Sequence, residues 1–242
     1  MSSNHLNLEE VDLDGAVRET EANVVETLER TGDTRLDFFK KAGIAGGAVV
    51  GGGALLGALV PGAALGKRGT GRPPAVFGEG DIGILNYALT LEYLERDFYN
   101  EAARNERRNP FLGKTGKNFL QAVVKDERAH VEFLRAALGS AAVAKPKFGF
   151  GGTTSDRKVF LRTSFALENT GVGAYSGQAL NIVDPANVAA ALSILTIEAR
   201  HAGLVGEIIR GNKGVAPYGP FDRTLSAKAV LKNVEKTGFI KG

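Results

Sequence analysis

Two short patterns each occur twice in this chain, and they alternate along it. The first is a Leu-Glu pair with a tyrosine seven residues after the glutamate, found at Leu91, Glu92 and Tyr99 and again at Leu167, Glu168 and Tyr175. The second is Glu-x-x-His, found at Glu127 and His130 and again at Glu198 and His201. The order Glu, Glu-x-x-His, Glu, Glu-x-x-His indicates a chain built from two similar halves.

Hydrophobic spacing around these patterns predicts four long helices. We expect them at residues 81 to about 107, 114 to 138, 155 to 182 and 185 to 210. Asp81 is the expected N-cap of the first helix, and Asp184 followed by Pro185 is a strong start for the last. Because residues 139–154 form a longer connection than the other two breaks, the chain is expected to be all-α. It should form a four-helix bundle of two helical hairpins joined by one long crossover.

The spacing of the second pattern suits a metal site. Residues three apart on a helix lie on one face, so each Glu-x-x-His can direct both side chains at one ion. Four carboxylates and two imidazoles suit two divalent ions, with iron or manganese favoured. The predicted metal ligands are Glu92, Glu127, His130, Glu168, Glu198 and His201.

The alternative is that these residues form buried salt bridges, for instance with Arg128 or Arg200. Both Glu-x-x-His patterns have apolar neighbours such as Phe133 and Leu204, which predicts burial. Buried carboxylates without cations are costly, so metal binding is favoured. The patterns also use two of the only three histidines in the chain.

Tyr99 and Tyr175 are predicted to support the ligands. Each lies about two helical turns after its glutamate, so its hydroxyl can reach a ligand across the bundle. The alternative is that both are ordinary core aromatics, but their matching positions in the two halves favour the supporting role.

Two acidic residues beside the predicted ligands, Glu95 and Asp126, each have two possible roles. The repeat selects Glu92 over Glu95 as the ligand, because the counterpart of Glu95 is Gly171. Glu95 is then either an acidic neighbour of the site or part of a solvated helix face. Asp126 is either an acceptor for an imidazole N–H or a surface residue.

The N-terminal region differs in charge from the rest of the chain. Residues 1–33 hold nine acidic and two basic residues, a net charge of −7, whereas residues 67–242 carry +8. We expect residues 1–41, an acidic leader with a basic flank, to lack stable structure. Residues 42–66 hold no charge and nine glycines, which predicts an export signal or a membrane anchor. The alternative is a flexible Gly/Ala arm.

The segment 34–43 resembles a twin-arginine export signal, but Leu36 stands where the second arginine should be. The protein is therefore expected to be exported or envelope-associated, with membrane contact through residues 42–66 and a cytoplasmic location as the alternative. Residues 67–80 are expected to be a linker, 81–211 the bundle, and 212–242 a C-terminal extension with a short helix at 224–236.

Composition excludes several other functions. The chain has no cysteine, which rules out disulfides, cysteine-ligated zinc and iron–sulfur clusters. Its basic residues are scattered and aromatics are few, so no nucleic-acid partner is expected.

Residues 81–210 resemble the ferritin-like superfamily, which includes bacterioferritins, rubrerythrins and manganese catalases. The stretch 85–99 (LNYALTLEYLERDFY) is especially similar to ferritin-like domain proteins of the desiccation-related type. The resemblance implies a ferritin-like bundle holding two iron ions, with manganese as the alternative. It also implies that Glu127 and Glu198 bridge the metals, and that Glu92, His130, Glu168 and His201 are terminal ligands.

The resemblance further implies a reaction with O₂ or hydrogen peroxide. The expected function is a di-iron oxidase, peroxidase or ferroxidase in oxidative or desiccation stress, with Glu127 and Glu198 as catalytic residues. The alternative is a non-enzymatic stress-protection or structural envelope protein in which the metals stabilise the bundle. The chain is expected to form a homo-oligomer, for example a dimer.

Overall fold

The structure is a computed structural model that describes residues 71–241. The expectations for the acidic leader, for the apolar segment 42–66 with its export signal, and for the first four residues of the linker lie outside these residues.

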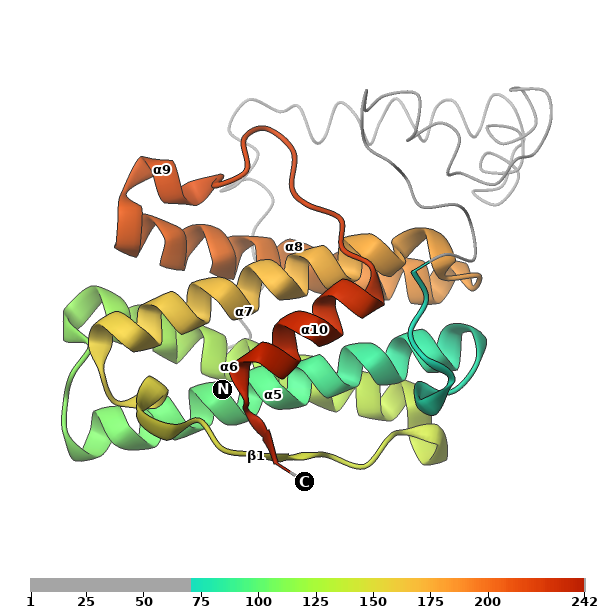
Figure 1. The fold of residues 1–242 in the computed structure, drawn as a ribbon, viewed down its shortest axis with the longest axis horizontal. Helices are drawn as coiled ribbons and strands as arrows, with labels where there is room; N and C mark the ends of the chain where they lie inside the picture. Colours follow the sequence, from blue (N-terminus) through green and yellow to red (C-terminus); the bar gives the residue numbers. More distant parts are fainter. Residues whose placement is uncertain (1–70, 242) are drawn as a thin grey trace, which may run out of the picture. The chain divides into compact units, whose positions relative to one another are not determined.

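Four long helices form the bundle: α5 (Gly80–Arg108), α6 (Gly113–Leu138), α7 (Arg157–Gln178) and α8 (Pro185–Arg210). α5 packs against α6 and α7 packs against α8, and contacts of α5 with α7 and of α6 with α8 join the two hairpins (Figure 1). The prediction of an all-α bundle made of two hairpins and one crossover is confirmed.

The start of α8 agrees with its sequence signal, whereas the start of α5 does not. Asp184 accepts a hydrogen bond from the Ala186 amide at 2.8 Å, as an N-cap should. The predicted cap at Asp81 is wrong, because Glu79 occupies the N-cap position of α5. The Asp81 carboxylate instead accepts hydrogen bonds from the amides of Val183 and Asp184, each at 2.9 Å. It therefore ties the first turn of α5 to the start of α8.

The helix α7 is shorter than predicted at both ends. Asp156 caps its start by accepting a hydrogen bond from the Val159 amide at 2.8 Å. At the other end the chain tightens into a 3₁₀ turn, η4 (Ala179–Asn181), where an α-helix was expected to continue to residue 182.

The crossover and the C-terminus hold each other in place. The crossover contains the 3₁₀ turns η2 (Gly139–Ala141) and η3 (Gly151–Thr154), with the short strand β1 (Lys147–Phe148) between them. β1 pairs antiparallel with β2 (Ile240–Lys241) near the end of the chain. The C-terminal extension is thus part of the folded domain.

A helix of the extension packs on the bundle. The short helix α9 (Asn212–Val215) follows α8, and α10 (Ala227–Thr237), close to the predicted 224–236, lies against α7. Just before α10, the Leu225 amide donates to the Gly173 carbonyl at 2.9 Å. A Cβ at Gly177 would lie 1.8 Å from the Leu225 carbonyl oxygen, so only glycine permits this close approach.

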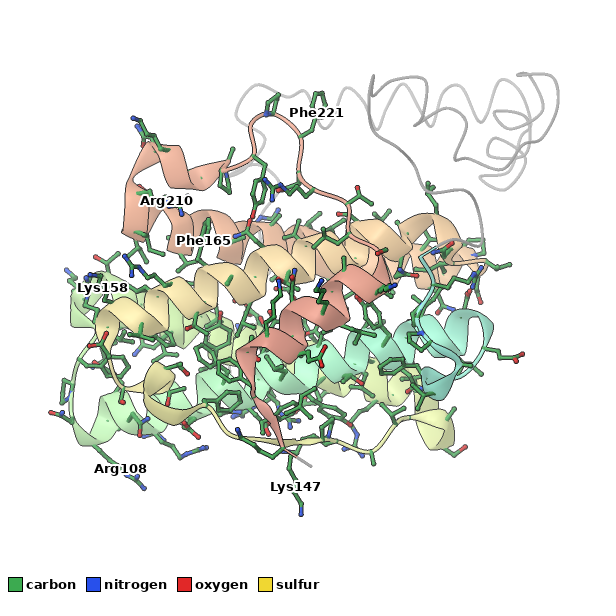
Figure 2. All side chains as sticks on the ribbon, viewed as in Figure 1. Arg108, Lys147, Lys158, Phe165, Arg210 and Phe221 are labelled. Atoms are coloured by element: carbon green, nitrogen blue, oxygen red, sulfur yellow. The ribbon has the colours of Figure 1, made fainter. Side chains whose placement is uncertain are left out.

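Two features of the surface lie near the same extension. The Arg210 guanidinium lies 5.0 Å from the centre of the Phe165 ring, so the end of α8 contacts α7. The loop that leads to α10 leaves Phe221 exposed (Figure 2).

The core consists of two apolar clusters with a polar layer between them. One cluster is rich in aromatic rings and includes Phe98, Phe119 and Phe160. The other is mostly aliphatic and includes Leu89 and Ile194. Along every long helix the predicted metal ligands lie between residues of the two clusters.

Among the described helices, α8 is long and apolar enough to cross a membrane by length and composition. Its buried face carries Glu198 and His201, as expected for a core helix of the bundle. Its outer face leaves Leu192 and Leu204 45% and 40% exposed. The two Glu-x-x-His patterns are buried, as predicted, but their apolar neighbours Leu204 and Phe133 do not cover them, since Phe133 is 48% exposed as well.

Candidate metal centre

The structure brings the six predicted ligands together from all four helices. Glu127 and His130 project from the same face of α6, and Glu198 and His201 do so from α8, because residues three apart share a helix face. Glu92 of α5 and Glu168 of α7 complete the cluster. All four glutamates have an exposed fraction of 0%.

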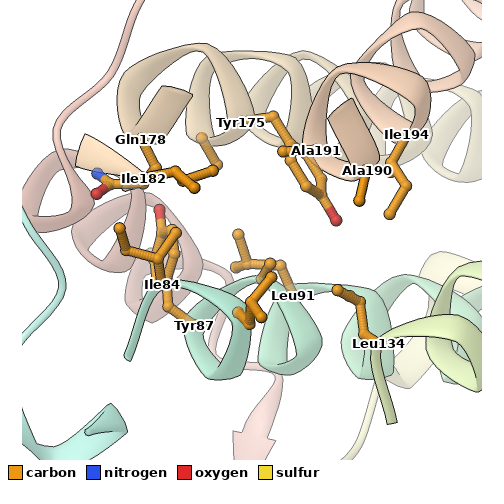
Figure 3. A pocket seen from close by; sticks show the side chains of 13 residues that line it. Ile84, Tyr87, Leu91, Leu134, Tyr175, Gln178, Ile182, Ala190, Ala191 and Ile194 are labelled. Carbon is orange, nitrogen blue, oxygen red and sulfur yellow. The ribbon is translucent and has the colours of Figure 1, made fainter. Parts of the chain in front are cut away.

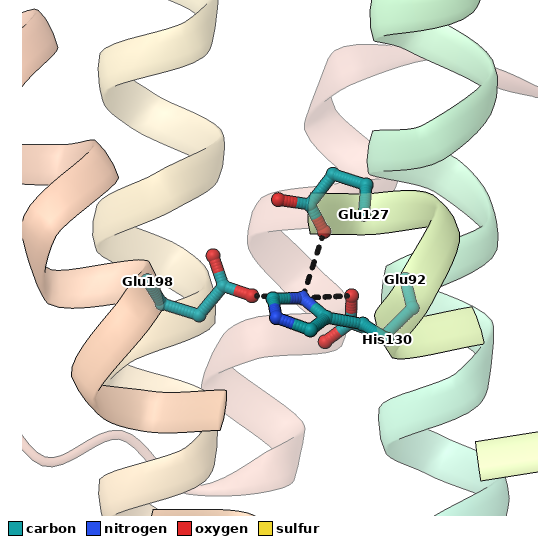
Figure 4. A group of neighbouring side chains, drawn as sticks. All are labelled: Glu92, Glu127, His130 and Glu198. Carbon is teal, nitrogen blue, oxygen red and sulfur yellow. Dashed lines mark hydrogen bonds and ion pairs between the residues drawn. The ribbon is translucent and has the colours of Figure 1, made fainter. Parts of the chain in front are cut away.

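Three carboxylates surround His130 (Figure 4). Its Nδ1 atom lies 3.3 Å from Glu92 Oε2, 3.3 Å from Glu127 Oε2 and 3.1 Å from Glu198 Oε1. These four side chains can each present one ligand atom within 4.8 Å of all the others.

His201 has an equivalent environment. Its Nδ1 atom lies 3.2 Å from Glu127 Oε1, 3.4 Å from Glu168 Oε2 and 3.4 Å from Glu198 Oε2. Because Nδ1 of an imidazole carries at most one proton, it cannot donate to three carboxylates at once. A cation placed among them can bind all four atoms.

Glu127 and Glu198 belong to both groups. Glu127 directs Oε2 toward His130 and Oε1 toward His201, and Glu198 directs Oε1 toward His130 and Oε2 toward His201. Each of these carboxylates can therefore contact two ions, which is what a bridging ligand does.

Glu92 and Glu168 each have one oxygen held by a tyrosine. The Tyr175 hydroxyl on α7 donates to Glu92 Oε1 on α5 at 2.5 Å. In the reciprocal contact, the Tyr99 hydroxyl on α5 donates to Glu168 Oε1 on α7. The remaining oxygen, Oε2, faces His130 in Glu92 and His201 in Glu168. This geometry suits a terminal ligand.

Several buried atoms of the cluster have no hydrogen-bond partner. They are Glu92 Oε2, Glu127 Oε1, Glu168 Oε2, both carboxylate oxygens of Glu198, and His201 Nδ1. Unpartnered buried oxygens of carboxylates are rare and costly. Every one of these atoms lies in the two groups that can hold an ion, so the residues fit a pair of bound cations.

The carboxylates shift one another's pKa values because they are buried close together. Burial and the neighbouring charges of Glu198 and Glu92 raise the pKa of Glu127 well above its usual range. Burial also raises the pKa of Glu168, to about 7, although His201 opposes the shift. Burial alone would raise the pKa of Glu198 too, but the imidazoles of His130 and His201, which face its two oxygens, outweigh burial and lower the pKa to about 2.

Asp126 orients the second histidine. Its Oδ2 atom lies 3.2 Å from His201 Nε2. A proton on Nε2 would then leave Nδ1 free to bind a metal, which is how a carboxylate orients a histidine ligand. Of the two assignments left open for Asp126, the structure favours the imidazole acceptor.

Glu95 is buried, with an exposed fraction of 4%, and does not lie on a solvated helix face. Burial, followed by the charges of Glu198, Glu168, Glu127 and Glu92, raises its pKa well above the usual range. A Cβ at Gly171 would lie 3.6 Å from Glu95 Oε1, so the glycine borders this carboxylate. Of the two assignments left open for Glu95, the structure favours the acidic neighbour of the site.

The salt-bridge alternative has no support from the two arginines considered for it. Arg128 and Arg200 are both exposed, and an Arg200 Nη atom donates to the Thr196 carbonyl at 3.3 Å. The positive partners of the buried carboxylates within the described residues are the two histidines.

A sequence model of the family described as ferritin-like domain matches residues 80–210. This range begins with the first residue of α5 and ends with the last residue of α8, so it covers the whole bundle and every residue of the cluster. No curated protein matches the chain.

Proposed function

The chain belongs to the ferritin-like domain family, and we propose that it binds two iron ions and reacts with O₂ or hydrogen peroxide as a ferroxidase or peroxidase. Manganese is the alternative metal, and oxidative or desiccation stress is the proposed setting. The observation that carries the proposal is the sharing of Glu127 and Glu198 between two four-residue groups that can each hold an ion.

The donor set supports this choice of metal. A glutamate from each of two helices with a Glu-x-x-His from each of the other two is the ligand set of di-iron and di-manganese carboxylate bundles. Carboxylate oxygens with one imidazole per ion suit iron and manganese, whereas the chain has no thiolate to favour softer metals. Glu92 and His130 would hold one ion, Glu168 and His201 the other, and Glu127 and Glu198 both.

Bound iron would supply the electrons that reduce O₂ or peroxide. Glu127 and Glu198 can follow a change in metal charge, because each has one oxygen toward either side of the centre. Tyr99 and Tyr175 hold Glu168 and Glu92 in place, and the two apolar clusters keep bulk water from the polar layer.

The second candidate is a metal that stabilises the bundle and does no chemistry. Four fully buried carboxylates disfavour the folded metal-free protein, so bound cations would stabilise the fold whether or not they react. This candidate predicts metal binding without turnover.

The two candidates are separated by adding Fe(II) to metal-free protein without oxygen and then admitting O₂ or peroxide. We expect two ions per chain and oxidation of Fe(II) much faster than in buffer, followed by absorbance and by oxygen consumption. Glu127→Gln should abolish both, whereas Glu132→Gln, an exposed glutamate on the same helix, should change neither. Metal uptake with oxidation no faster than in buffer would leave only the stabilising role.

A further inference from the structure

A small cavity lies in the aliphatic half of the core, beside the candidate metal centre. It has a volume of about 20 Å³, which is room for one small molecule. Its walls come from all four long helices and are almost wholly apolar, with Ala88, Leu91, Leu134, Ala191 and Ile194 among them (Figure 3).

One polar group in this cavity has no partner. The Tyr87 hydroxyl is buried and has no hydrogen-bond partner among residues 71–241. The other polar groups in the wall are engaged: the Gln178 amide nitrogen donates to the Gly71 carbonyl at 2.7 Å, and its oxygen accepts from Asn181 at 3.0 Å. The Tyr175 hydroxyl donates to Glu92. The cavity thus offers a guest one hydrogen-bonding group and otherwise methyl and methylene groups.

The cavity and the metal centre share one side chain. Tyr175 lines the cavity, and its hydroxyl donates to Glu92. Leu91, the residue before Glu92, lines the cavity too. A molecule held here would therefore contact a side chain that is hydrogen-bonded to a predicted metal ligand.

The other half of the bundle is filled at the corresponding place. The ring of Tyr99, the counterpart of Tyr175, packs against Phe119 and Phe160 with centroids 6.0 and 6.1 Å apart. On the Tyr175 side, the counterparts of these two phenylalanines in the repeat are Ala190 and Ile84, and both line the cavity. The two halves of the bundle therefore differ at this place, although their sequence patterns match. The cavity lies in the half that contains Tyr175.

We propose that this cavity binds dioxygen and supplies it to the metal centre, so that O₂ and not hydrogen peroxide is the oxidant. The proposal rests on the proposed function and specifies its substrate. An apolar cavity stays dry and takes apolar guests. Hydrogen peroxide would lose most of its hydrogen bonds to water on entering and would regain at most those to Tyr87.

The first test uses metal-free protein, so that it does not depend on catalysis. Dissolved O₂ is paramagnetic and speeds the relaxation of nearby methyl protons in NMR spectra. Under O₂ pressure, compared with N₂, the methyl groups of Ala88, Ala191 and Ile194 should relax several-fold faster than those of Ala227 and Val230. The last two are buried in the aromatic cluster and serve as controls. Equal enhancement in both sets would overturn the proposal.

The second test fills the cavity with Ala191→Leu. In metal-free protein the added side chain should remove the excess relaxation at Ala88 and Ile194. In iron-loaded protein it should slow oxidation by O₂ several-fold and leave oxidation by hydrogen peroxide unchanged. If Ala191→Leu slows oxidation by O₂ and by hydrogen peroxide equally, or slows neither reaction, the O₂ route is contradicted. The unmodified protein could oxidise Fe(II) no faster than buffer while the methyl groups at the cavity relax faster under O₂. That result would contradict the proposed function but not the binding of O₂ in the cavity.

Tyr87→Phe keeps the test decisive if Ala191→Leu does not fold. Loss of the hydroxyl removes the one group that can hold a water molecule in the cavity, so the relaxation enhancement should persist or grow. An enhancement that is absent from the unmodified protein and appears only in Tyr87→Phe would show that water occupies the cavity, and the O₂ proposal would then be wrong.

Discussion

The Tyr175 hydroxyl on α7 donates a 2.5 Å hydrogen bond to Glu92 Oε1 on α5. The bond leaves Glu92 with one free oxygen, which faces His130 at 3.3 Å. Tyr99 does the same for Glu168 from the opposite helix. The two tyrosines therefore orient the two glutamates that have a single oxygen toward the centre.

Tyr175→Phe should weaken metal binding by about 10- to 100-fold, the usual effect of removing a group that orients a ligand. The reason is that Glu92 can then rotate and its Oε1 atom is buried without a donor. Competition with a chelator measures the affinity. Tyr93→Phe is the matched control, since Tyr93 is equally buried on α5 and lies under Arg96, and it should bind metal normally. If the two variants bind metal with equal affinity, Tyr175 does not orient a metal ligand.

Glu127→Gln should change metal content and stability in opposite directions. Metal analysis is expected to show loss of both ions, because Glu127 belongs to both groups. The midpoint of thermal unfolding, Tm, of the metal-free protein should rise, because folding then no longer buries a carboxyl group whose pKa is raised well above its usual range. Glu132→Gln should leave both quantities unchanged. A lower Tm in the metal-free Glu127→Gln protein would mean that the carboxylate has a stabilising partner even without metal.

The metal-free protein should lose stability as pH rises from about 4.5 to 7. Burial raises the pKa of Glu168 from 4.5 to about 7, so the folded state holds this proton more tightly than the unfolded state does. The resulting stabilisation is complete below pH 4.5 and is lost as pH rises through 7. The pKa values of His130 and His201 are raised as well, which extends the loss above pH 6.5. Among the described residues Glu198 and Asp81 act in the opposite sense, and their effect is confined to pH below 4.5.

Thermal unfolding at a series of pH values checks this prediction. Metal binding displaces the protons, so the difference in Tm between metal-loaded and metal-free protein should grow with pH. A metal-free Tm that is constant from pH 4.5 to 7 would contradict the raised pKa of Glu168.

Gly177→Ala should loosen the C-terminal extension from α7. Its new Cβ would lie 1.8 Å from the Leu225 carbonyl oxygen, a backbone atom that cannot move alone. We expect a loss of about 1–3 kcal/mol in the free energy of unfolding, typical of overpacking, and faster proteolysis before α10. Gly152→Ala is the control, because a Cβ there would meet nothing within 4 Å. If both variants behave alike, the close approach of α7 and Leu225 is not important for stability.

The expectation of a homo-oligomer stays a prediction, and the outer face of α8 is the place to test it. Leu192→Glu adds a charge on this apolar face and should shift the sedimentation of an oligomer toward the monomer. Val159→Glu on α7, where the parent side chain is 42% exposed, should have no such effect. A chain that sediments as a monomer before any substitution would refute the expectation directly.

The amino-acid pattern alone predicted the four long helices and the six candidate ligands. The start of α8 followed from Asp184 and Pro185, and the six predicted ligands followed from two repeated patterns, because residues three apart must share a helix face. It did not settle which side chains face solvent. Phe133 and Leu204 were expected to be buried and are exposed, whereas Glu95 could equally have been solvated and is buried.

Which groups meet across the bundle depends on the tertiary structure. The reciprocal bonds of Tyr175 to Glu92 and of Tyr99 to Glu168, and the division of the Glu127 oxygens between two histidines, depend on how four helices are rotated and placed. Local spacing specifies the face of one helix, but the rotation of a helix against its neighbours results from packing of the whole core. The same packing left a cavity beside Tyr175 and filled the matching place beside Tyr99, although the two patterns of sequence are alike.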